Sequence, residues 1–102
     1  MAYGVVVTMP VPVEMYDSLH REVLEQTEGK IDGLLLHIGR PVRNGFQVIE
    51  VWESKDLSDR YNQEVVWPLT ARVWADRPLT GEPTIEEFEV RGVVIPAALI
   101  AL

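Results

Sequence analysis

The sequence predicts an α+β domain of the ferredoxin-like type, in which one antiparallel sheet and two helices follow the order β-α-β-β-α-β. Two observations carry this prediction. Apolar residues alternate or run together over four strand-like stretches, and they recur at helical spacing over two others. The chain also has 102 residues, which is the length of one domain with its own core. Residues 1–102 are therefore expected to form a single domain.

The first third of the chain predicts a strand followed by a helix. Tyr3 to Met9 is an apolar, β-branched run that Pro10 and Pro12 close, as expected of a strand. Glu14 to Glu28 changes to helical spacing, and Gly29 can adopt the left-handed conformation that ends a helix. The apolar stripe of this helix consists of Tyr16, Leu19, Val23 and Thr27.

The middle of the chain predicts a hairpin and a second helix. Strands are expected over Leu34 to Arg40 and Phe46 to Glu53, joined by a tight turn that contains Asn44-Gly45. Ser54 is the expected N-cap of the helix that follows. Pro68 is expected to kink or restart this helix, because proline disfavours helical geometry at the residue before it. The apolar stripe consists of Leu57, Tyr61 and Val65.

The last part of the chain predicts a loop, a long strand and an apolar tail. Asp76 to Pro83 is rich in proline and glycine, which predicts a loop. From Thr84 to Ile95, charged and apolar residues alternate, as expected of a strand with one solvent-exposed face. The tail over residues 96–102 is too apolar to extend into water. We expect it at a dimer interface, where a second sheet covers the open face of the first. The alternative is a tail folded onto its own core.

Composition excludes several classes of function. A net charge of −7 and a pI near 4.7 oppose binding to nucleic acid or to an anionic membrane surface. The chain has no cysteine, so thiolate nucleophiles and thiolate metal sites are excluded. No apolar run approaches the roughly 18 residues of a membrane-spanning helix, and the first residues lack a signal-peptide pattern. A cytoplasmic location is expected.

The register of the hairpin decides where its ionisable residues lie. Any pairing in which the two residue numbers have an odd sum, such as Arg40 opposite Gly45, places His37 on one face with Glu50 and Trp52. The other face is then wholly apolar, whereas a slip by one residue would put polar groups on both faces. We therefore predict the segregated arrangement. The apolar face would carry Leu34, Leu36, Ile38, Ile49 and Val51, and Val48 would join His37.

The same segment resembles a known superfamily. The residues Gly33-Leu34-Leu35-Leu36-His37, Asn44 to Ser54 (NGFQVIEVWES), Leu57 and Tyr61 resemble the dimeric α+β-barrel superfamily, which includes antibiotic-biosynthesis-monooxygenase-like domains. The resemblance implies a homodimer in which two ferredoxin-like sheets share a barrel. Its members include cofactor-free oxygenases acting on polycyclic phenols, haem-degrading enzymes, isomerases and proteins without known activity. The fold alone therefore leaves the function open.

His37 and Glu50 are the candidate catalytic residues. A neighbouring carboxylate would orient the histidine and raise its basicity, so that His37 could remove a proton from a phenol or an activated carbon acid. The candidate substrate-binding residues are Trp52, Tyr61, Asn62 and Tyr16. Three hypotheses follow: a cofactor-independent oxygenase, a binding module for an apolar or aromatic ligand, and a dimer in which the two residues only satisfy one another.

The remaining histidine and tryptophans are expected to be structural. His20, one helical turn after Tyr16, is expected near the edge of the apolar stripe as a partly exposed surface histidine. Trp67 and Trp74 are expected in the core or at an interface. No metal site is expected, since two histidines without cysteine fit no compact ligand spacing. A haem would need His20 or His37 as its axial ligand, and no sequence feature favours one. No cofactor is therefore expected.

Overall fold

The computed structural model describes residues 2–77, 79 and 81–102 and contains the predicted order of elements. The central sheet has four antiparallel strands in the order β2-β3-β1-β4. The elements are β1 (Tyr3–Met9), α1 (Val13–Thr27), β2 (Leu34–Val42), β3 (Gly45–Trp52), α2 (Lys55–Tyr61), the π-helical turn η1 (Asn62–Val66), α3 (Trp67–Val73), β4 (Thr84–Glu89), β5 (Val94–Ile95), the 3₁₀ turn η2 (Pro96–Ala98) and β6 (Ile100–Ala101). The ferredoxin-like prediction is confirmed.

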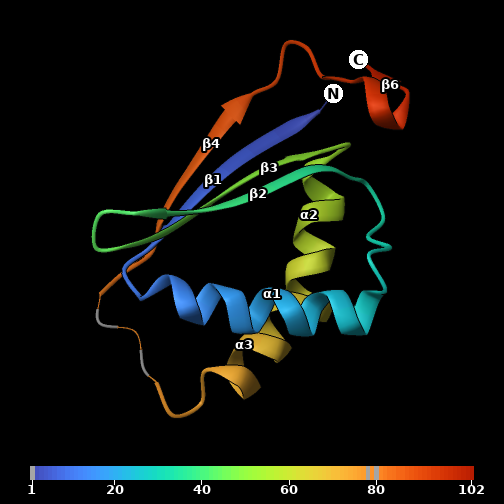
Figure 1. Ribbon diagram of the computed structural model, residues 1–102. Coiled ribbons are helices and arrows are strands. Elements are labelled where there is room, and N and C mark those ends of the chain that lie inside the picture. Colours follow the sequence, from blue (N-terminus) through green and yellow to red (C-terminus); the bar gives the residue numbers. More distant parts are fainter. Residues whose placement is uncertain (1, 78, 80) are drawn as a thin grey trace.

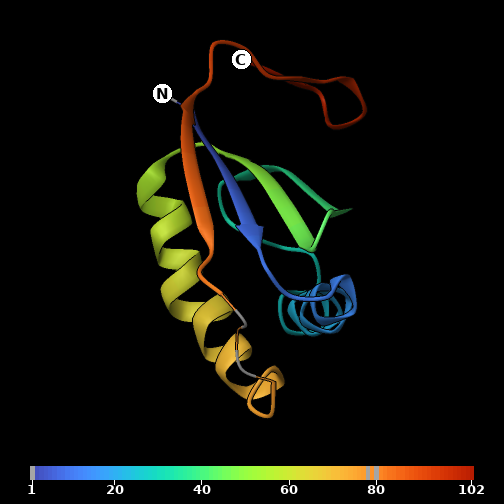
Figure 2. The same ribbon diagram turned by 90° about the vertical axis from the view of Figure 1, so that its left-hand side faces the viewer.

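The helices cover one face of the sheet, and the C-terminal segment lies on the other side (Figure 1). Figure 2 shows α1 nearly end-on and the continuous α2-η1-α3 segment along its length beside the strands. The two helical segments lie at separate places on the sheet. A small apolar core joins α1, β3 and the end of α3. It consists of Val11, Met15, Phe46 and Trp74, and the Trp74 indole donates a 2.9 Å hydrogen bond to the Met15 carbonyl.

The predicted segregation of the hairpin faces is confirmed in part. His37, Glu50 and Trp52 share one face, but the opposite face is not wholly apolar, because Arg40 and Gln47 pair on it beside Ile38 and Ile49. His37 lies opposite Glu50 and Ile38 opposite Ile49, so the residue numbers of each pair have an odd sum. The specific example was wrong, because Arg40 pairs with Gln47 and the turn is shorter than expected. Asn44 adopts the positive φ of 66° that this tight turn requires. A register shift between Leu34 and Leu36 removes Leu34 from the predicted apolar face and places it opposite Trp52.

The residues at the helix ends explain where the helices begin and end. Both Glu28 and the predicted stop residue Gly29 have positive φ after α1. The Ser54 hydroxyl accepts a hydrogen bond from the Leu57 amide, which confirms the predicted cap of α2. Pro68 does not break the segment: Trp67 stays helical, and a π-helical turn precedes it where the proline removes a donor.

One prediction about the second half of the chain is wrong. The long strand predicted to Ile95 ends at Glu89, because the residues beyond it turn away to pair with the tail: Val93 and Leu102 exchange two backbone hydrogen bonds, and β5 pairs with β6. Of the two places expected for Trp67, the core is excluded, since 61% of its surface is exposed. Trp74 is buried, as predicted. In the loop predicted over Asp76 to Pro83, residues 78 and 80 lie outside the described residues.

Candidate functional site

A cavity of about 410 Å³ lies between the helical layer and the sheet. This volume is within the range of small-molecule sites, and most of its wall is apolar, as is usual for such sites. The sheet contributes residues from all four strands, and the rest come from α1, the α2-η1-α3 segment and the loop before β4. The lining residues include Val7, Met9, Leu19, Val23, Phe46, Val48, Val66 and Trp74, together with the polar residues Tyr16, His20, His37, Glu50, Tyr61, Asn62 and Thr70.

A chain of hydrogen bonds connects four side chains at the cavity wall. The Trp52 indole N–H donates to Glu50 Oε1 over 3.1 Å, and Glu50 Oε2 lies 2.7 Å from His37 Nδ1. The Tyr16 hydroxyl lies 2.8 Å from His37 Nε2. A carboxylate can only accept, so Nδ1 carries the imidazole hydrogen and the neutral Nε2 accepts from the tyrosine. Both nitrogens of His37 are therefore engaged within the protein.

Strand pairing and one glycine place these four groups together. His37 and Glu50 are directly opposite on β2 and β3, and Trp52 follows Glu50 by two residues on the same face. Tyr16 reaches them from α1 by crossing over Gly39, where an added Cβ would overlap the tyrosine ring. A residue without a side chain at position 39 is therefore part of how the site is built.

Both tyrosines at the site are held in their neutral form. Burial raises the pKa of the Tyr16 hydroxyl, with smaller contributions from the charges of Asp17 and Glu50. Burial also raises the pKa of Tyr61, and Glu50 and Tyr16 add to the effect. Tyr16 and Tyr61 are therefore hydrogen-bond donors at neutral pH rather than anions. Glu50 is the carboxylate that the cavity wall presents beside them.

The structure brings five of the six predicted site residues to the cavity. His37, Glu50, Tyr16, Tyr61 and Asn62 all line it. The sixth requires a correction: Trp52 was expected to form an aromatic wall, but its side chain is 0% exposed and lies outside the lining. Its indole packs against Tyr61 at a ring-centroid distance of 5.2 Å and donates to Glu50. Trp52 therefore supports the carboxylate from behind instead of facing the cavity.

Sequence reasoning missed two residues that line the cavity. His20 was expected as a partly exposed histidine near the edge of the apolar stripe, which its half-burial matches, but its place in the cavity wall, stacked on Tyr16 and His37, was not predicted. Its position four residues after Tyr16, hence on the same helix face, was the available signal. Trp67 lines the cavity from α3 while remaining largely exposed. With Leu79 and Ile85, which are also exposed, it gives the cavity an apolar mouth.

The structure also bears on metal binding and on membrane-spanning helices. In the described part of the chain, no group of three or more histidine, aspartate or glutamate side chains is placed to share a metal ion. Among residues 2–77, 79 and 81–102, no helix is both long and apolar enough to cross a bilayer.

Comparisons with known proteins identify solved structures with a similar fold. No family model and no curated protein matches the chain. Among solved structures, a candidate antibiotic biosynthesis monooxygenase from Nitrosomonas europaea is similar with a TM-score of 0.71 and 12% identity, over 88% of this chain and 90% of that one. A counterpart from Caulobacter crescentus CB15 has a TM-score of 0.67 and 16% identity, over 87% and 89% of the two chains.

The likeness extends to a protein without an assigned activity. A conserved protein from Methanosarcina mazei Go1 has a TM-score of 0.67 and 16% identity, over 86% of this chain and 91% of that one. Matches at such identities describe architecture and leave function open. The resemblance seen in the sequence is thus confirmed at the level of the fold: the chain has the ferredoxin-like α+β fold of the antibiotic-biosynthesis-monooxygenase-like proteins.

Proposed function

We propose that the protein is a cofactor-independent oxygenase, or a related enzyme, that removes a proton from an aromatic or polyketide-like small molecule in the cavity. The observation that carries this proposal is the pairing of His37 with Glu50 at the wall of an otherwise apolar chamber. A carboxylate 2.7 Å from Nδ1 stabilises the imidazolium that forms when the other nitrogen takes up a proton. His37 is the proposed base and Glu50 its orienting partner.

The proposed proton path runs through Tyr16. Because the tyrosine hydroxyl already donates to His37 Nε2, the acidic C–H or O–H group of a substrate would meet the tyrosine oxygen first. The substrate proton moves to that oxygen while the tyrosine proton moves to Nε2. The raised pKa of Tyr16 means that the residue passes a proton on instead of remaining ionised. The products of this step are a substrate anion and an imidazolium paired with Glu50.

The oxidation that follows uses molecular oxygen as the only oxidant. With an anthrone, the anion transfers electrons to oxygen, and a carbon–oxygen bond forms at the deprotonated carbon. The O–O bond then breaks, one oxygen atom stays as a carbonyl and the other leaves as water with the two hydrogens of the original methylene group. Tyr61 and Asn62, at the junction of α2 and η1, line the cavity and are the proposed substrate-orienting groups.

Oxygen uptake with an anthrone tests this function. We expect the wild-type protein to consume one oxygen molecule per quinone formed, and His37→Ala to lower the rate by roughly 10²- to 10⁴-fold, the usual contribution of general base catalysis. Arg43→Ala, at the exposed tip of the β2–β3 hairpin, is the matched control and should retain the wild-type rate. Circular dichroism verifies that each variant is folded. Equal rates for wild type and His37→Ala would refute the role of His37.

A second function is favoured by one observation. In the described part of the chain, every buried side-chain nitrogen and oxygen has a hydrogen-bond partner without any ligand. Such a satisfied network also suits a protein that binds an apolar or aromatic molecule and leaves it unchanged. Stabilisation of the protein against heat by the anthrone, with no product detected by mass spectrometry, would favour this binding function over turnover.

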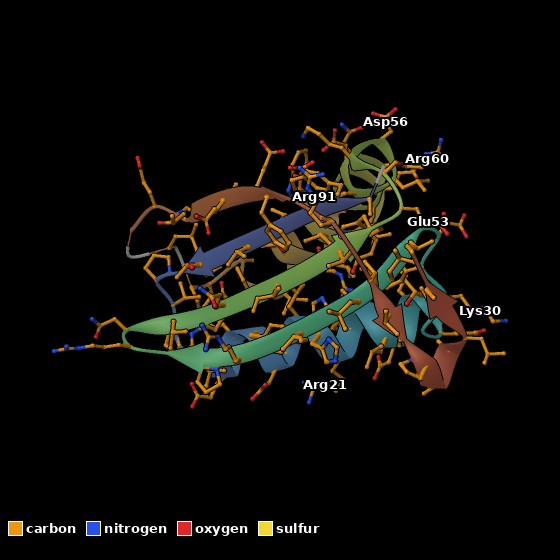
Figure 3. All side chains as sticks on the ribbon, turned by 90° about the horizontal axis from the view of Figure 1, so that it is seen from above. Arg21, Lys30, Glu53, Asp56, Arg60 and Arg91 are labelled. Atoms are coloured by element: carbon orange, nitrogen blue, oxygen red, sulfur yellow. The ribbon has the colours of Figure 1, made fainter. Side chains whose placement is uncertain are left out.

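We further propose that the protein is a homodimer that forms through the sheet face opposite the helices. This face carries the apolar side chains Val6, Ile38, Ile49 and Phe88, by alternation from the register of the strands. The tail beside it exposes 94% of Leu99 and 64% of Leu102. Figure 3 looks onto this face, with the helices behind the strands, and the labelled Arg21 of α1 and Asp56 and Arg60 of α2 belong to that helical layer.

Light scattering at micromolar concentration tests the dimer. We expect a mass of twice the 11.6 kDa of one chain. Ile38→Asp should shift the mass to that of one chain, because it places a charge on an apolar position of the proposed interface. Ile38 is already 44% exposed, so the variant is expected to fold. A wild-type protein that sediments and scatters as a single chain would rule the dimer out.

A further inference from the structure

His20 differs from His37 in how its ring nitrogens are used. Both rings lie nearly parallel to Tyr16 at the cavity wall: His20 is 5.2 Å from Tyr16 and 5.5 Å from His37, with interplanar angles of 14° and 7°. His37 has Glu50 on one nitrogen and Tyr16 on the other. Neither nitrogen of His20, by contrast, has a hydrogen-bond partner among the residues that the structure describes.

The position of the His20 imidazole at the cavity wall allows a bound molecule to form a hydrogen bond with it. His20 is half-buried and lines the cavity, between the apolar side chains of Leu19 and Val23 on the same helix. In the described part of the chain no side-chain nitrogen is both buried and without a hydrogen-bond partner, so the ring nitrogens of His20 remain accessible. A molecule in the cavity can supply the missing partner, since the free nitrogens belong to a ring that forms part of the cavity wall.

The charge state of the ring fits this use. Burial lowers the pKa of His20, the neighbouring His37 lowers it further, and Asp17 opposes the shift in part. The ring is therefore neutral at pH 7 and offers one N–H donor and one lone-pair acceptor. A hydroxyl group can pair with either, because it both donates and accepts.

We propose that His20 is a ligand-binding residue of the cavity, whose imidazole forms a hydrogen bond with a hydroxyl group on the edge of a flat aromatic molecule. Tyr16, His20 and His37 present three nearly parallel rings from one side of the cavity. A planar ligand can lie beside this stack with its polar edge towards the free nitrogens. The proposal rests on the cavity being the ligand site, as in the proposed function, but it requires no turnover.

A pair of probes that differ by one hydroxyl group tests the proposal. Naphthol and naphthalene have the same ring system, and their affinities are measured by calorimetry for the wild type and for His20→Phe, which keeps an aromatic ring on Tyr16 but has no nitrogen. We expect the variant to bind naphthol about 3- to 10-fold more weakly, the worth of one neutral hydrogen bond. Its affinity for naphthalene should be unchanged. Arg21→Gln, on the exposed side of the same helix, should bind both probes as the wild type does.

A second measurement needs no variant. The chain has two histidines, so the ring nitrogens of both can be followed by NMR in the wild-type protein. Naphthol should move the His20 ring nitrogen signals and naphthalene should leave them nearly in place. The proposal is overturned if both probes shift His20 equally, if His20→Phe weakens both equally or neither, or if naphthol fails to bind. Selective naphthol binding without oxygen uptake would refute the oxygenase and leave the role of His20 intact.

Discussion

Trp52→Ala is expected to lower the free energy of unfolding by about 3–5 kcal/mol, the range measured for truncating a large buried aromatic residue. Trp52 is the largest fully buried side chain of the described residues, with 0% of its surface exposed. It packs on Tyr61 and holds Glu50 through its indole N–H. Truncation therefore removes packing between β3 and α2 and the hydrogen bond to the carboxylate together. A domain of this size has about 5–15 kcal/mol of stability, so the change is a large fraction of it.

Urea unfolding followed by circular dichroism measures this effect, and two variants separate its causes. Trp67→Ala is the matched control: the same substitution at a side chain that is 61% exposed should change the stability by no more than about 0.5 kcal/mol. Trp52→Phe keeps most of the ring but leaves Glu50 Oε1 without its donor, and should cost about 1–3 kcal/mol. A Trp52→Ala loss as small as that of Trp67→Ala would contradict the assigned packing.

Glu50→Gln is expected to disable proton uptake by His37 while keeping the shape of the site. Glutamine can still accept from the Trp52 indole, but it carries no negative charge beside His37 Nδ1. The imidazolium that forms on proton uptake would then lack the anionic partner that lies 2.7 Å from Nδ1 in the wild type. Oxygen uptake should therefore fall. An unchanged rate in a folded Glu50→Gln variant would show that the carboxylate does not support the base.

The contact between His37 and Glu50 could be predicted because alternation constrains strand pairing. Only an odd-sum register placed His37, Glu50 and Trp52 on one face, and the observed pairing of His37 with Glu50 has that property, although Arg40 and Gln47 lie on the opposite face. The loop length was not predictable in the same way. The register is displaced by two residues from the example of Arg40 opposite Gly45, which leaves the faces unchanged.

Three features could not be predicted because they depend on contacts between distant parts of the chain: the burial of Trp52, the position of His20 and the end of β4. Alternation assigns Trp52 to the face of His37, but it says nothing of whether α2 covers that end of the strand, and Tyr61 does. The helical spacing of His20 did not show that its edge of α1 faces the cavity. The alternating pattern predicted that the strand would continue beyond Glu89. Instead, Val93 pairs with Leu102, a contact that forms only once the tail has folded back.

The ionisation state of a bound phenol tests most directly whether His37 acts as a base in this cavity. Para-nitrophenol absorbs visible light only as the phenolate, so its spectrum in the protein, recorded below the pKa of the free phenol, reports proton transfer without any turnover. We expect phenolate in the wild-type complex, and the neutral phenol in His37→Gln and Glu50→Gln, because an apolar cavity disfavours an anion that has no cationic partner. Equal phenolate fractions in the wild type and His37→Gln would contradict the proposed proton transfer.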